Sequence, residues 1–418
     1  MTLASIKNHT QPLDVKAGLF DGIAKKAVLR ALTYLRRGHL TLVDGLDVYE
    51  FGQPTNEATL CVRVIIEHSS AYADILQDTG VGAGKAYIKG TWTTPDLQSV
   101  IRVFAQNLDW IEQRDKNKFI RKRLSQIVNA LLYANSLSGA KRNIAAHYDL
   151  SNEFFSLMLD DTMMYSSAIF TDEASTLHAA SLHKLETICQ QLELKASDHL
   201  VEIGTGWGGM AIYAASHYGC RVTTTTISKE QHAFAVDAVN KAGLGDLVTV
   251  LQKDYRELEG QFDKLVSVEM IEAVGHSHYN TYFKKCNDLL KPDGLMLIQA
   301  ITIPDQRYEA AKNAVDFIQR YIFPGGCLPS HQVMLNCIKR QSDMRLIGFT
   351  EIGHHYATTL EHWRAAFFEH VDAIQKMGFD DKFCRMWEFY LSYCEAGFRE
   401  RTIGTGHFVF AKPLHVMA

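Results

Sequence analysis

Short apolar runs alternate with helix-length amphipathic segments through the second half of the chain, and this rhythm constrains the fold more than any other feature. The six apolar runs are HLVEIG, RVTTTTIS, LVTVLQKDY, FDKLVSVEM, LMLIQAI and HFVFAKP, between residues 199 and 413. Strand–helix alternation is the mark of a mostly parallel sheet with helices on both faces. The sequence therefore predicts a doubly wound α/β domain, with HFVFAKP as a late strand or an edge strand.

The first 112 residues have a different pattern, which predicts a smaller α+β domain. Two segments, 23–37 and 95–111, have apolar residues at helical spacing, with Gly38 as a C-cap and Pro95 in a first turn. Between them, LTLVDG, LDVYEFG and TLCVRVIIEH alternate and end in turn residues, as short strands do. We expect residues 1–112 to form an accessory domain.

A basic run separates the two patterns. Residues 114–123 carry six basic side chains and one acid. Such a run is either a solvated linker or a patch for anionic phosphate head groups, and the sequence leaves both readings open. We place a basic helical linker at 113–140 and the catalytic domain at 141–418.

Composition narrows the class of protein. The net charge of −4 gives no reason to expect a nucleic-acid partner. The first residues, MTLASIKNHTQPLDV, have no apolar core of a secretory signal, and no run of about 18 apolar residues predicts a membrane span. The eight cysteines are scattered without a CxxC pair, so we expect reduced thiols, no metal site and a cytoplasmic protein.

A glycine-rich turn follows the first strand of the alternating region, in LVEIGTGWGGM (200–210). Its spacing lacks the GxGxxG order of dinucleotide sites, and no lysine follows as in a Walker phosphate loop. With Glu202 before Gly204, Gly206 and Gly208, the E/D-x-G-x-G pattern resembles motif I of S-adenosylmethionine-dependent methyltransferases. There the glycines make room for the methionine and ribose parts of the cofactor.

Polar residues at the ends of the next two strands extend this prediction. TTISKEQ places Thr226, Ser228 and Gln231 at the end of the second strand. KDYREL places Asp254 and Tyr255 at the end of the third, where the methyltransferase fold commonly has a residue that bonds the adenine amino group. Ligands of open α/β sheets bind at this edge.

Several longer segments resemble one family, the cyclopropane-fatty-acyl-phospholipid synthases. They include HYDLSNEFFSLMLDDTMMYSSAIF, SVEMIEAVGHSHYNTYF, LKPDGLMLIQAITIPD and DFIQRYIFPGGCLPS, and with the C-terminal tail they cover most of residues 140–413. The resemblance implies a seven-stranded methyltransferase sheet and cofactor contacts from Tyr148, Tyr165 and Ser166. It also implies a reaction in which the sulfonium methyl is attacked by the cis double bond of a phospholipid acyl chain, followed by loss of one proton and closure of a cyclopropane ring.

In this family the base is thought to be a bound bicarbonate. The resemblance assigns its ligands to the carboxyl of Glu272, the Tyr356 hydroxyl and the backbone of Ile301. Two positions depart from the family pattern: Ser167 stands where the family has Cys, and Gln299 where it has His. Both can still donate hydrogen bonds to an anion, but Gln299 cannot relay a proton as histidine can.

Four functions stay open at this point, one of them a small-molecule methyltransferase that acts away from membranes. The first is cyclopropane formation on phospholipid. The second is C-methylation of the same kind of chain, giving methyl-branched or methylated furan-type acids, because the changes at Ser167 and Gln299 fall where the fate of the proton is decided. The third is a lipid-binding protein without catalysis. The resemblance also implies peripheral contact with the inner face of the membrane and, through the accessory domains, a homodimer.

Overall fold

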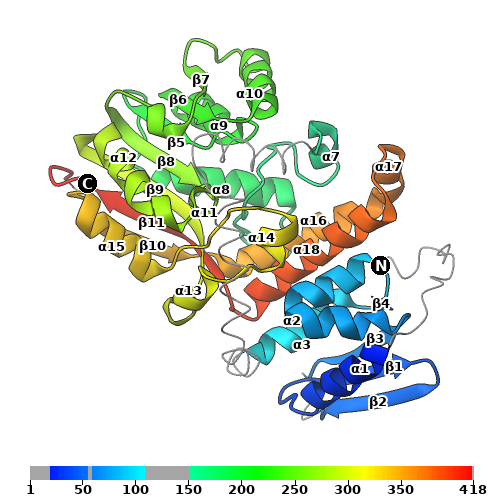
Figure 1. The fold of residues 1–418 in the computed structure, drawn as a ribbon. Coiled ribbons are helices and arrows are strands. Elements are labelled where there is room, and N and C mark those ends of the chain that lie inside the picture. Colours follow the sequence, from blue (N-terminus) through cyan, green and yellow to red (C-terminus); the bar gives the residue numbers. More distant parts are fainter. Residues whose placement is uncertain (1–18, 55–58, 109–149, 417–418) are drawn as a thin grey trace. The chain divides into compact units, whose positions relative to one another are not determined.

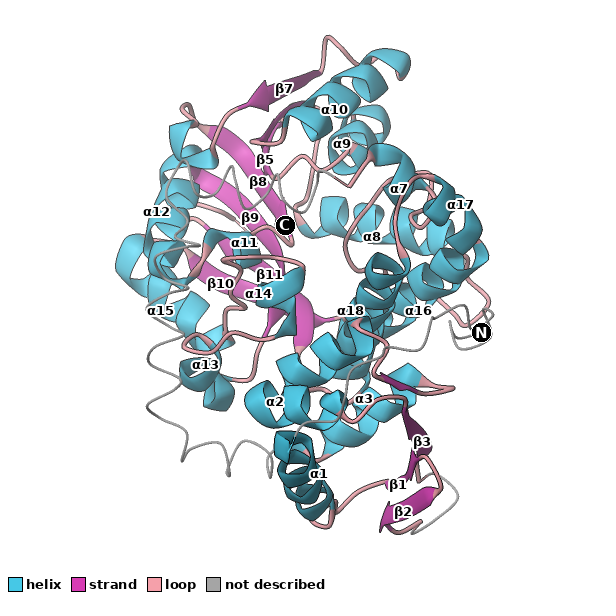
Figure 2. Ribbon diagram, turned by 45° about the vertical axis from the view of Figure 1, so that its right-hand side comes forward, coloured by secondary structure: helices cyan, strands magenta, loops and turns pink. Residues whose placement is uncertain are grey.

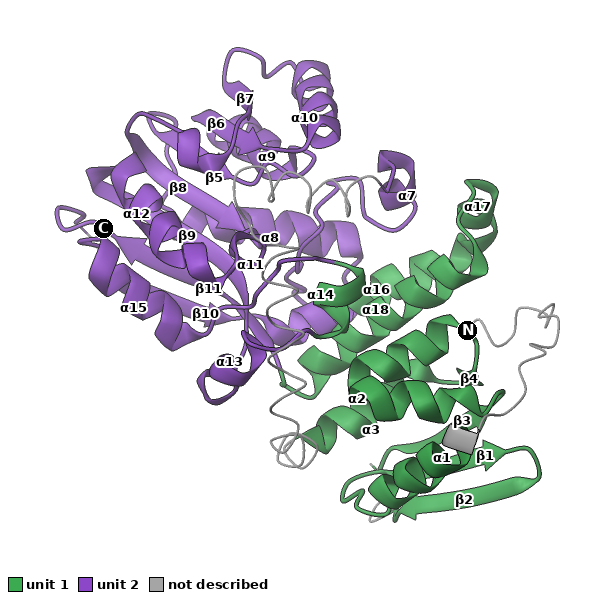
Figure 3. Cartoon of the chain, viewed as in Figure 1, with its two compact units in different colours: residues 1–124, 316–322, 360–402 green, residues 125–315, 323–359, 403–418 purple. Residues whose placement is uncertain are grey.

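The computed structural model describes residues 19–54, 59–108 and 150–416. Contacts divide the chain into two compact units (Figure 3): unit 1 contains residues 1–124, 316–322 and 360–402, and unit 2 the remainder. Unit 1 thus gathers two C-terminal segments around the N-terminal region. The division into accessory domain, linker and catalytic domain is a statement about function and stays a prediction, and the basic run at 114–123 lies outside the described residues.

Unit 2 is built on a seven-stranded sheet in the order β10-β11-β9-β8-β5-β6-β7 (Figure 1). Its strands are β5 (His199–Ile203), β6 (Arg221–Thr226), β7 (Val248–Gln252), β8 (Phe262–Val268), β9 (Leu290–Thr302), β10 (Arg345–Glu351) and β11 (Gly404–Ala411). All neighbours pair in parallel except β11, which is antiparallel to both β9 and β10. The predicted doubly wound, mostly parallel fold is confirmed.

Helices cover both faces of this sheet (Figures 1 and 2). The helices of unit 2 are α7 (Asn152–Ser156), α8 (Leu177–Gln191), α9 (Gly209–Tyr218), α10 (Lys229–Lys241), α11 (Ile271–Val274), α12 (Tyr279–Leu289), α13 (Asp305–Ala311) and α15 (His331–Gln341), with short 3-10 turns η3 (Tyr255–Glu257) and η4 (His276–His278). One core packs α12 and α15 onto the sheet, and a second packs α8 and α9 onto it. Neighbouring residues of a strand, such as Leu265 and Val266, enter opposite cores, as a sheet buried on both faces requires.

Unit 1 has its own sheet, in the order β2-β1-β3-β4. The unit comprises α1 (Leu19–Leu32), β1 (His39–Asp44), β2 (Asp47–Gly52), β3 (Cys61–Ile66), α2 (Ser70–Ile88), β4 (Trp92–Thr93), α3 (Leu97–Gln106), α14 (Phe317–Tyr321), α17 (Val371–Lys376) and α18 (Asp381–Arg399). Helix α16 (Gly353–Glu369) begins in unit 2 and ends in unit 1. Within the described residues, no helix has both the length and the apolar character needed to cross a membrane.

Three local predictions are corrected. Pro95 precedes the N-cap Asp96 of α3 and is not in its first turn, because the Asp96 carboxylate takes the capping position by accepting from Ser99 N–H. Gly38 is not the C-cap of α1, which ends at Leu32, but adopts a φ of +85° in the turn before β1. The HFVFAKP run forms β11, a late strand that lies inside the sheet, so it is not an edge strand.

Candidate active site

The glycine-rich turn connects β5 to α9. Gly204, Gly206 and Gly208 have φ angles of +103°, +53° and +96°, which glycine adopts without a steric penalty. The backbone N–H groups of Gly204 and Thr205 both donate to the carbonyl oxygen of Thr225, at 3.1 Å. These bonds tie the turn to the end of β6, at the edge of the sheet where ligands of this fold bind.

The turn leaves room for a ligand. A Cβ atom added at Gly206 would meet no heavy atom within 4 Å. The acid before the turn, Glu202, is 2% exposed, and among the described residues its Oε2 atom has no hydrogen-bond partner. Burial raises the pKa of Glu202 to about 8. Space beside the backbone and a buried polar atom without a partner fit S-adenosylmethionine, which brings its own hydroxyl and amino groups.

The three predicted cofactor residues after β6 bond to one another. Thr226 Oγ1 donates to Gln231 Oε1 at 2.8 Å, and Gln231 N–H donates to Ser228 Oγ at 3.2 Å. Ser228 is the N-cap of α10, and all three side chains are buried. Their network therefore fixes the first turn of α10, while their contact with a cofactor stays a prediction.

Asp254 is also held by the chain. Its two carboxylate oxygens accept from Arg256 Nε at 2.8 Å and Arg256 Nη2 at 2.7 Å, and it caps the η3 turn. Next to it, the Tyr255 ring meets the ring of Tyr282 edge-on, with centroids 5.5 Å apart. The bidentate pair fixes the Asp254 carboxylate in position, and its role toward the adenine stays a prediction.

A buried lysine lies beside the predicted cofactor residue Ser166. Lys184, on α8, is fully buried and donates from Nζ to Ser166 Oγ at 3.0 Å. Burial lowers the pKa of Lys184 to about 8, while the charges of Glu269, Asp160 and Glu202 act in the opposite direction. Lys184 therefore provides a positive charge close to both the glycine turn and the end of β8.

Two tyrosines, Tyr165 and Tyr148, are also predicted to contact the cofactor. The Tyr165 ring packs edge-on against Phe155 of α7, with centroids 5.1 Å apart. Tyr148 lies outside the described residues.

A carboxylate of the chain occupies the centre of the predicted base site. Glu269 Oε1 accepts from Ser167 N–H at 2.9 Å and from Gln299 Nε2 at 2.7 Å. Glu269 Oε2 accepts from the Tyr356 hydroxyl at 2.6 Å. Burial raises the pKa of Glu269, and these three donors oppose that rise by stabilising the charged form.

Glu272 lies one turn further along, on α11. Its Oε1 atom accepts from Ile301 N–H at 2.6 Å, and its Oε2 atom has no hydrogen-bond partner among the described residues. Burial raises the pKa of Glu272 to about 8, and the neighbouring Glu269 charge adds to the rise. A charge on Glu269 therefore favours the protonated form of Glu272.

These contacts do not fit a bicarbonate ion in the predicted position. Three of its predicted ligands, Ser167, Gln299 and Tyr356, hold Glu269, and the Ile301 N–H holds Glu272. The Ser167 hydroxyl is not directed at an anion, because it donates to the Ala168 carbonyl at 3.0 Å. The residues predicted to gather around an external anion do converge, but on a side chain of the protein.

The side chain of Gln299 is in turn contacted by His407. His407 on β11 pairs with Gln299 on β9 in the antiparallel register, and its Nε2 lies 3.0 Å from Gln299 Oε1. Burial lowers the pKa of His407 to about 3, and the single N–H of the neutral ring faces either Gln299 Oε1 or Gln191 Oε1, which lies 2.8 Å from Nδ1. With its oxygen toward His407, Gln299 directs its NH₂ group at Glu269.

Sequence reasoning missed three residues of this site. Glu269 follows a buried strand and precedes Glu272 by three positions, which was a signal for a carboxylate pair. Lys184 falls on the buried face of α8 beside Leu185, an unusual place for an ammonium group. His407 is the only titratable residue within its buried strand. Each of these sequence signals was present, but only the pairing of strands that are distant in the sequence shows that the three residues belong to the site.

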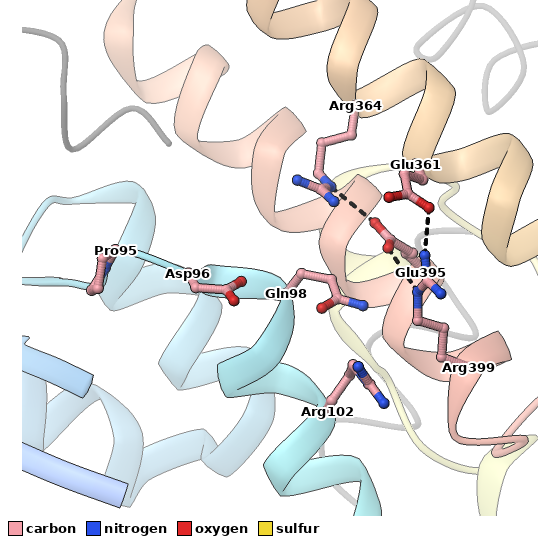
Figure 4. Close-up of a pocket in the computed structure, with 8 residues that line it drawn as sticks. All are labelled: Pro95, Asp96, Gln98, Arg102, Glu361, Arg364, Glu395 and Arg399. Carbon is pink, nitrogen blue, oxygen red and sulfur yellow. Dashed lines mark hydrogen bonds and ion pairs between the residues drawn. The ribbon is translucent and has the colours of Figure 1, made fainter. Parts of the chain in front are cut away.

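A separate hollow lies within unit 1 (Figure 4). It is lined by Pro95, Asp96, Gln98, Arg102, Glu361, Arg364, Glu395 and Arg399. Its three arginines face three carboxylates, and both Arg364 and Arg399 already pair with Glu395 at 2.9 Å. Without a net positive charge the hollow has no attraction for a phosphate group, and it contains no candidate site residue.

Comparisons with known proteins identify the family of the chain. The family model described as mycolic acid cyclopropane synthetase matches residues 135–408. The tuberculostearic acid methyltransferase of Mycobacterium tuberculosis is 39% identical over 326 residues, covering 76% of this chain and 76% of that protein. The cyclopropane-fatty-acyl-phospholipid synthase of Escherichia coli strain K12 is 35% identical over 353 residues, covering 83% and 87%.

Solved structures give the same result. The crystal structure of a mycolic acid cyclopropane synthase complexed with SAH and CTAB is 29% identical, with a TM-score of 0.60, and covers 65% of this chain and 98% of that one. The chain therefore belongs to the mycolic acid cyclopropane synthetase family and is an S-adenosylmethionine-dependent methyltransferase of the cyclopropane-fatty-acyl-phospholipid synthase type.

Proposed function

We propose that this enzyme transfers a one-carbon unit from S-adenosylmethionine to the cis double bond of an unsaturated phospholipid acyl chain and closes a cyclopropane ring. The observation that carries the proposal is the juxtaposition of two features on paired strands. The glycine turn follows β5, the carboxyl pair Glu269 and Glu272 follows β8, and these strands are parallel neighbours.

The chemistry explains why such a site is suited to an alkene. S-adenosylmethionine, when bound, supplies the methyl group on a positively charged sulfur. An alkene has no acidic proton, so no base is needed before transfer, and its π electrons form the new C–C bond. The protein must exclude water, tolerate positive charge on the acyl chain and accept one proton afterwards. The carboxyl groups of Glu269 and Glu272, which follow β8, are the side chains placed to meet the last two needs.

A second candidate function is C-methylation of the same chain. Here the cation loses a proton from the chain itself and keeps the whole methyl group. Two observations favour keeping it: the departures at Ser167 and Gln299, and the 39% identity to a tuberculostearic acid methyltransferase. A catalytically inactive lipid-binding protein is the alternative from another class. We also propose peripheral contact with a phospholipid surface and a homodimer.

Labelled methyl donor distinguishes these functions. Purified protein is given trideuteromethyl S-adenosylmethionine and vesicles with cis-monounsaturated chains, and the released acyl chains are analysed by mass and fragmentation. We expect a saturated ring product with two deuterium atoms, because the proton leaves from the transferred methyl group. Three deuterium atoms in a methyl-branched product would establish C-methylation instead. Absence of label from the lipid, with cofactor still bound, would contradict both.

A further inference from the structure

We infer that Glu269 is a built-in base, which accepts the proton released in the reaction and makes a bicarbonate ion unnecessary in this enzyme. The inference rests on the proposed function and deepens it. It starts from the disagreement found in the site: the donors expected around an external anion already hold a carboxylate of the chain.

The geometry of Glu269 is that of a bound anion. A backbone N–H, an amide NH₂ and a phenol hydroxyl converge on its two oxygens at 2.9, 2.7 and 2.6 Å. They come from Ser167, Gln299 and Tyr356, which are 102, 30 and 87 residues away in sequence. A carboxylate and a bicarbonate present the same planar pair of oxygens, so one side chain can satisfy the donors that an ion would.

The backbone at Glu269 indicates that the side chain holds this position against a local preference. Its φ angle is +48°, in the left-handed region, which is unfavourable for a non-glycine residue. Its N–H donates to the Gln299 carbonyl at 2.8 Å, so the same neighbour fixes both backbone and side chain. Strained residues of this kind are concentrated at functional sites.

A carboxylate that acts as a base must be less enclosed than one with a purely structural role. The Glu269 residue is only partly buried, whereas its partners Ser167 and Gln299 are fully buried. Glu269 is therefore less enclosed than Ser167 and Gln299, which are shielded from water. Gln299 is a positioning residue, because an amide cannot accept the proton and its orientation is set by His407.

The proton-transfer step balances without any added reactant. After methyl transfer the S–CH₃ bond has broken with its electron pair on sulfur, and the acyl chain carries the positive charge. A Glu269 oxygen takes a proton from the new methyl group, and the C–H electron pair closes the third side of the ring. If the proton leaves from a chain carbon instead, the same electron pair forms a double bond and the methyl group is retained.

Two substitutions of Glu269 test this role in opposite ways. Glu269→Gln keeps the shape and fills the site but removes the base, so we expect a 10²- to 10⁴-fold loss of turnover that bicarbonate does not restore. Glu269→Gly suits the positive φ angle and leaves the three donors around an open space. We expect this variant to be inactive in CO₂-free buffer and to regain activity when bicarbonate is added.

The measurement is turnover of labelled methyl donor into lipid, in CO₂-free buffer with and without bicarbonate. Bicarbonate binding is measured in parallel by calorimetry, and we expect it for Glu269→Gly but not for the unsubstituted protein. Glu259→Gln, at an exposed acid, is the matched control for loss of one carboxylate. Thermal midpoints and SAH affinity establish that each variant is folded and binds the cofactor product.

Several results would overturn the inference. One is an unsubstituted enzyme whose product formation requires bicarbonate. Another is Glu269→Gln with near-normal turnover. Glu272→Gln keeps an acceptor for Ile301 N–H and resembles the protonated acid, so a loss larger than that of Glu269→Gln would assign the proton to Glu272. Failure of the proposed function gives a different result from failure of this inference. In that case the unsubstituted protein would form no lipid product in either buffer.

Discussion

Glu269 and Glu272 are three positions apart, yet their surroundings give them different states. Glu269 has three donors on its oxygens, whereas Glu272 has one, from Ile301 N–H. Stabilising the charge of one acid raises the pKa of its neighbour, and the Glu269 charge is a cause of the Glu272 shift to about 8. The three donors on Glu269 thus stabilise its charged form more than the single donor on Glu272 does.

His407 makes a testable contribution to stability at low pH. Burial lowers its pKa from 6.5 to about 3, so between these values the unfolded chain binds a proton that the folded protein does not. The stabilisation is present above pH 6.5 and is lost as the pH falls toward 3. His407→Gln should weaken this dependence by up to about 1.4 kcal/mol per pH unit.

The measurement is the thermal midpoint from pH 7.5 to 4.5. His217→Gln, at an exposed histidine, is the control and should follow the unsubstituted protein. An acid-induced loss of midpoint that is the same in His407→Gln as in the unsubstituted protein would contradict the assignment.

At the scale of elements, close packing requires glycine at one position of helix α2, although glycine is a poor helix former. Helix α2 is kinked at Asp78 and Thr79, and Gly80 and Gly84 lie in its helical part after the kink. A Cβ at Gly84 would lie 2.4 Å from the ring of Phe317, which is 2% exposed and packs on Phe389 at a centroid distance of 4.5 Å. A Cβ at Gly80 would meet nothing within 4 Å. The same residue type therefore has a steric role at one position and none at the other.

Substituting these two glycines should change stability in opposite directions. Gly84→Ala should destabilise unit 1 by about 1–3 kcal/mol, because Phe317 is enclosed and must move. Gly80→Ala should stabilise it by about 0.5–1 kcal/mol through the entropy of the unfolded chain. Thermal midpoints of the two variants are the measurement, and equal increases for both would show that α14 does not pack against α2 as described.

For the whole molecule, the acidic net charge of −4 and the local basic run at 114–123 lead to different expectations for membranes. If only the net negative charge of the protein mattered, anionic lipid would repel it. A basic run next to a lipid surface instead attracts it, with about 1 kcal/mol from each residue.

Vesicle binding decides between these expectations. We expect the protein to sediment with vesicles that contain anionic lipid and to be released by salt, because exposed charges are screened. Replacing Arg121, Lys122 and Arg123 with Gln should weaken binding about a hundredfold. Binding to neutral vesicles that is insensitive to salt and to this triple substitution would exclude the basic run as the contact.

The sequence by itself determined what depends on local pattern. The alternation of buried strands and helices predicted the parallel sheet, and the glycine turn after Glu202 predicted the cofactor end of it, because burial and backbone freedom leave periodic and compositional signals. Strand β10 left no such signal, since RLIGFTE is exposed along most of its length, and it was missed.

Only the tertiary structure decided what the predicted base site contains. The family resemblance implied that Ser167, Gln299, Tyr356 and Ile301 are neighbours, but the identity of the anion among them depended on where the Glu269 side chain lies. That position results from β8 lying beside β9 and from the approach of α16 and residues 165–168, whose contacts span up to 102 residues of chain. Hydrogen bonds between such distant segments leave no periodic pattern in the sequence, so their geometry emerges only when the chain is folded.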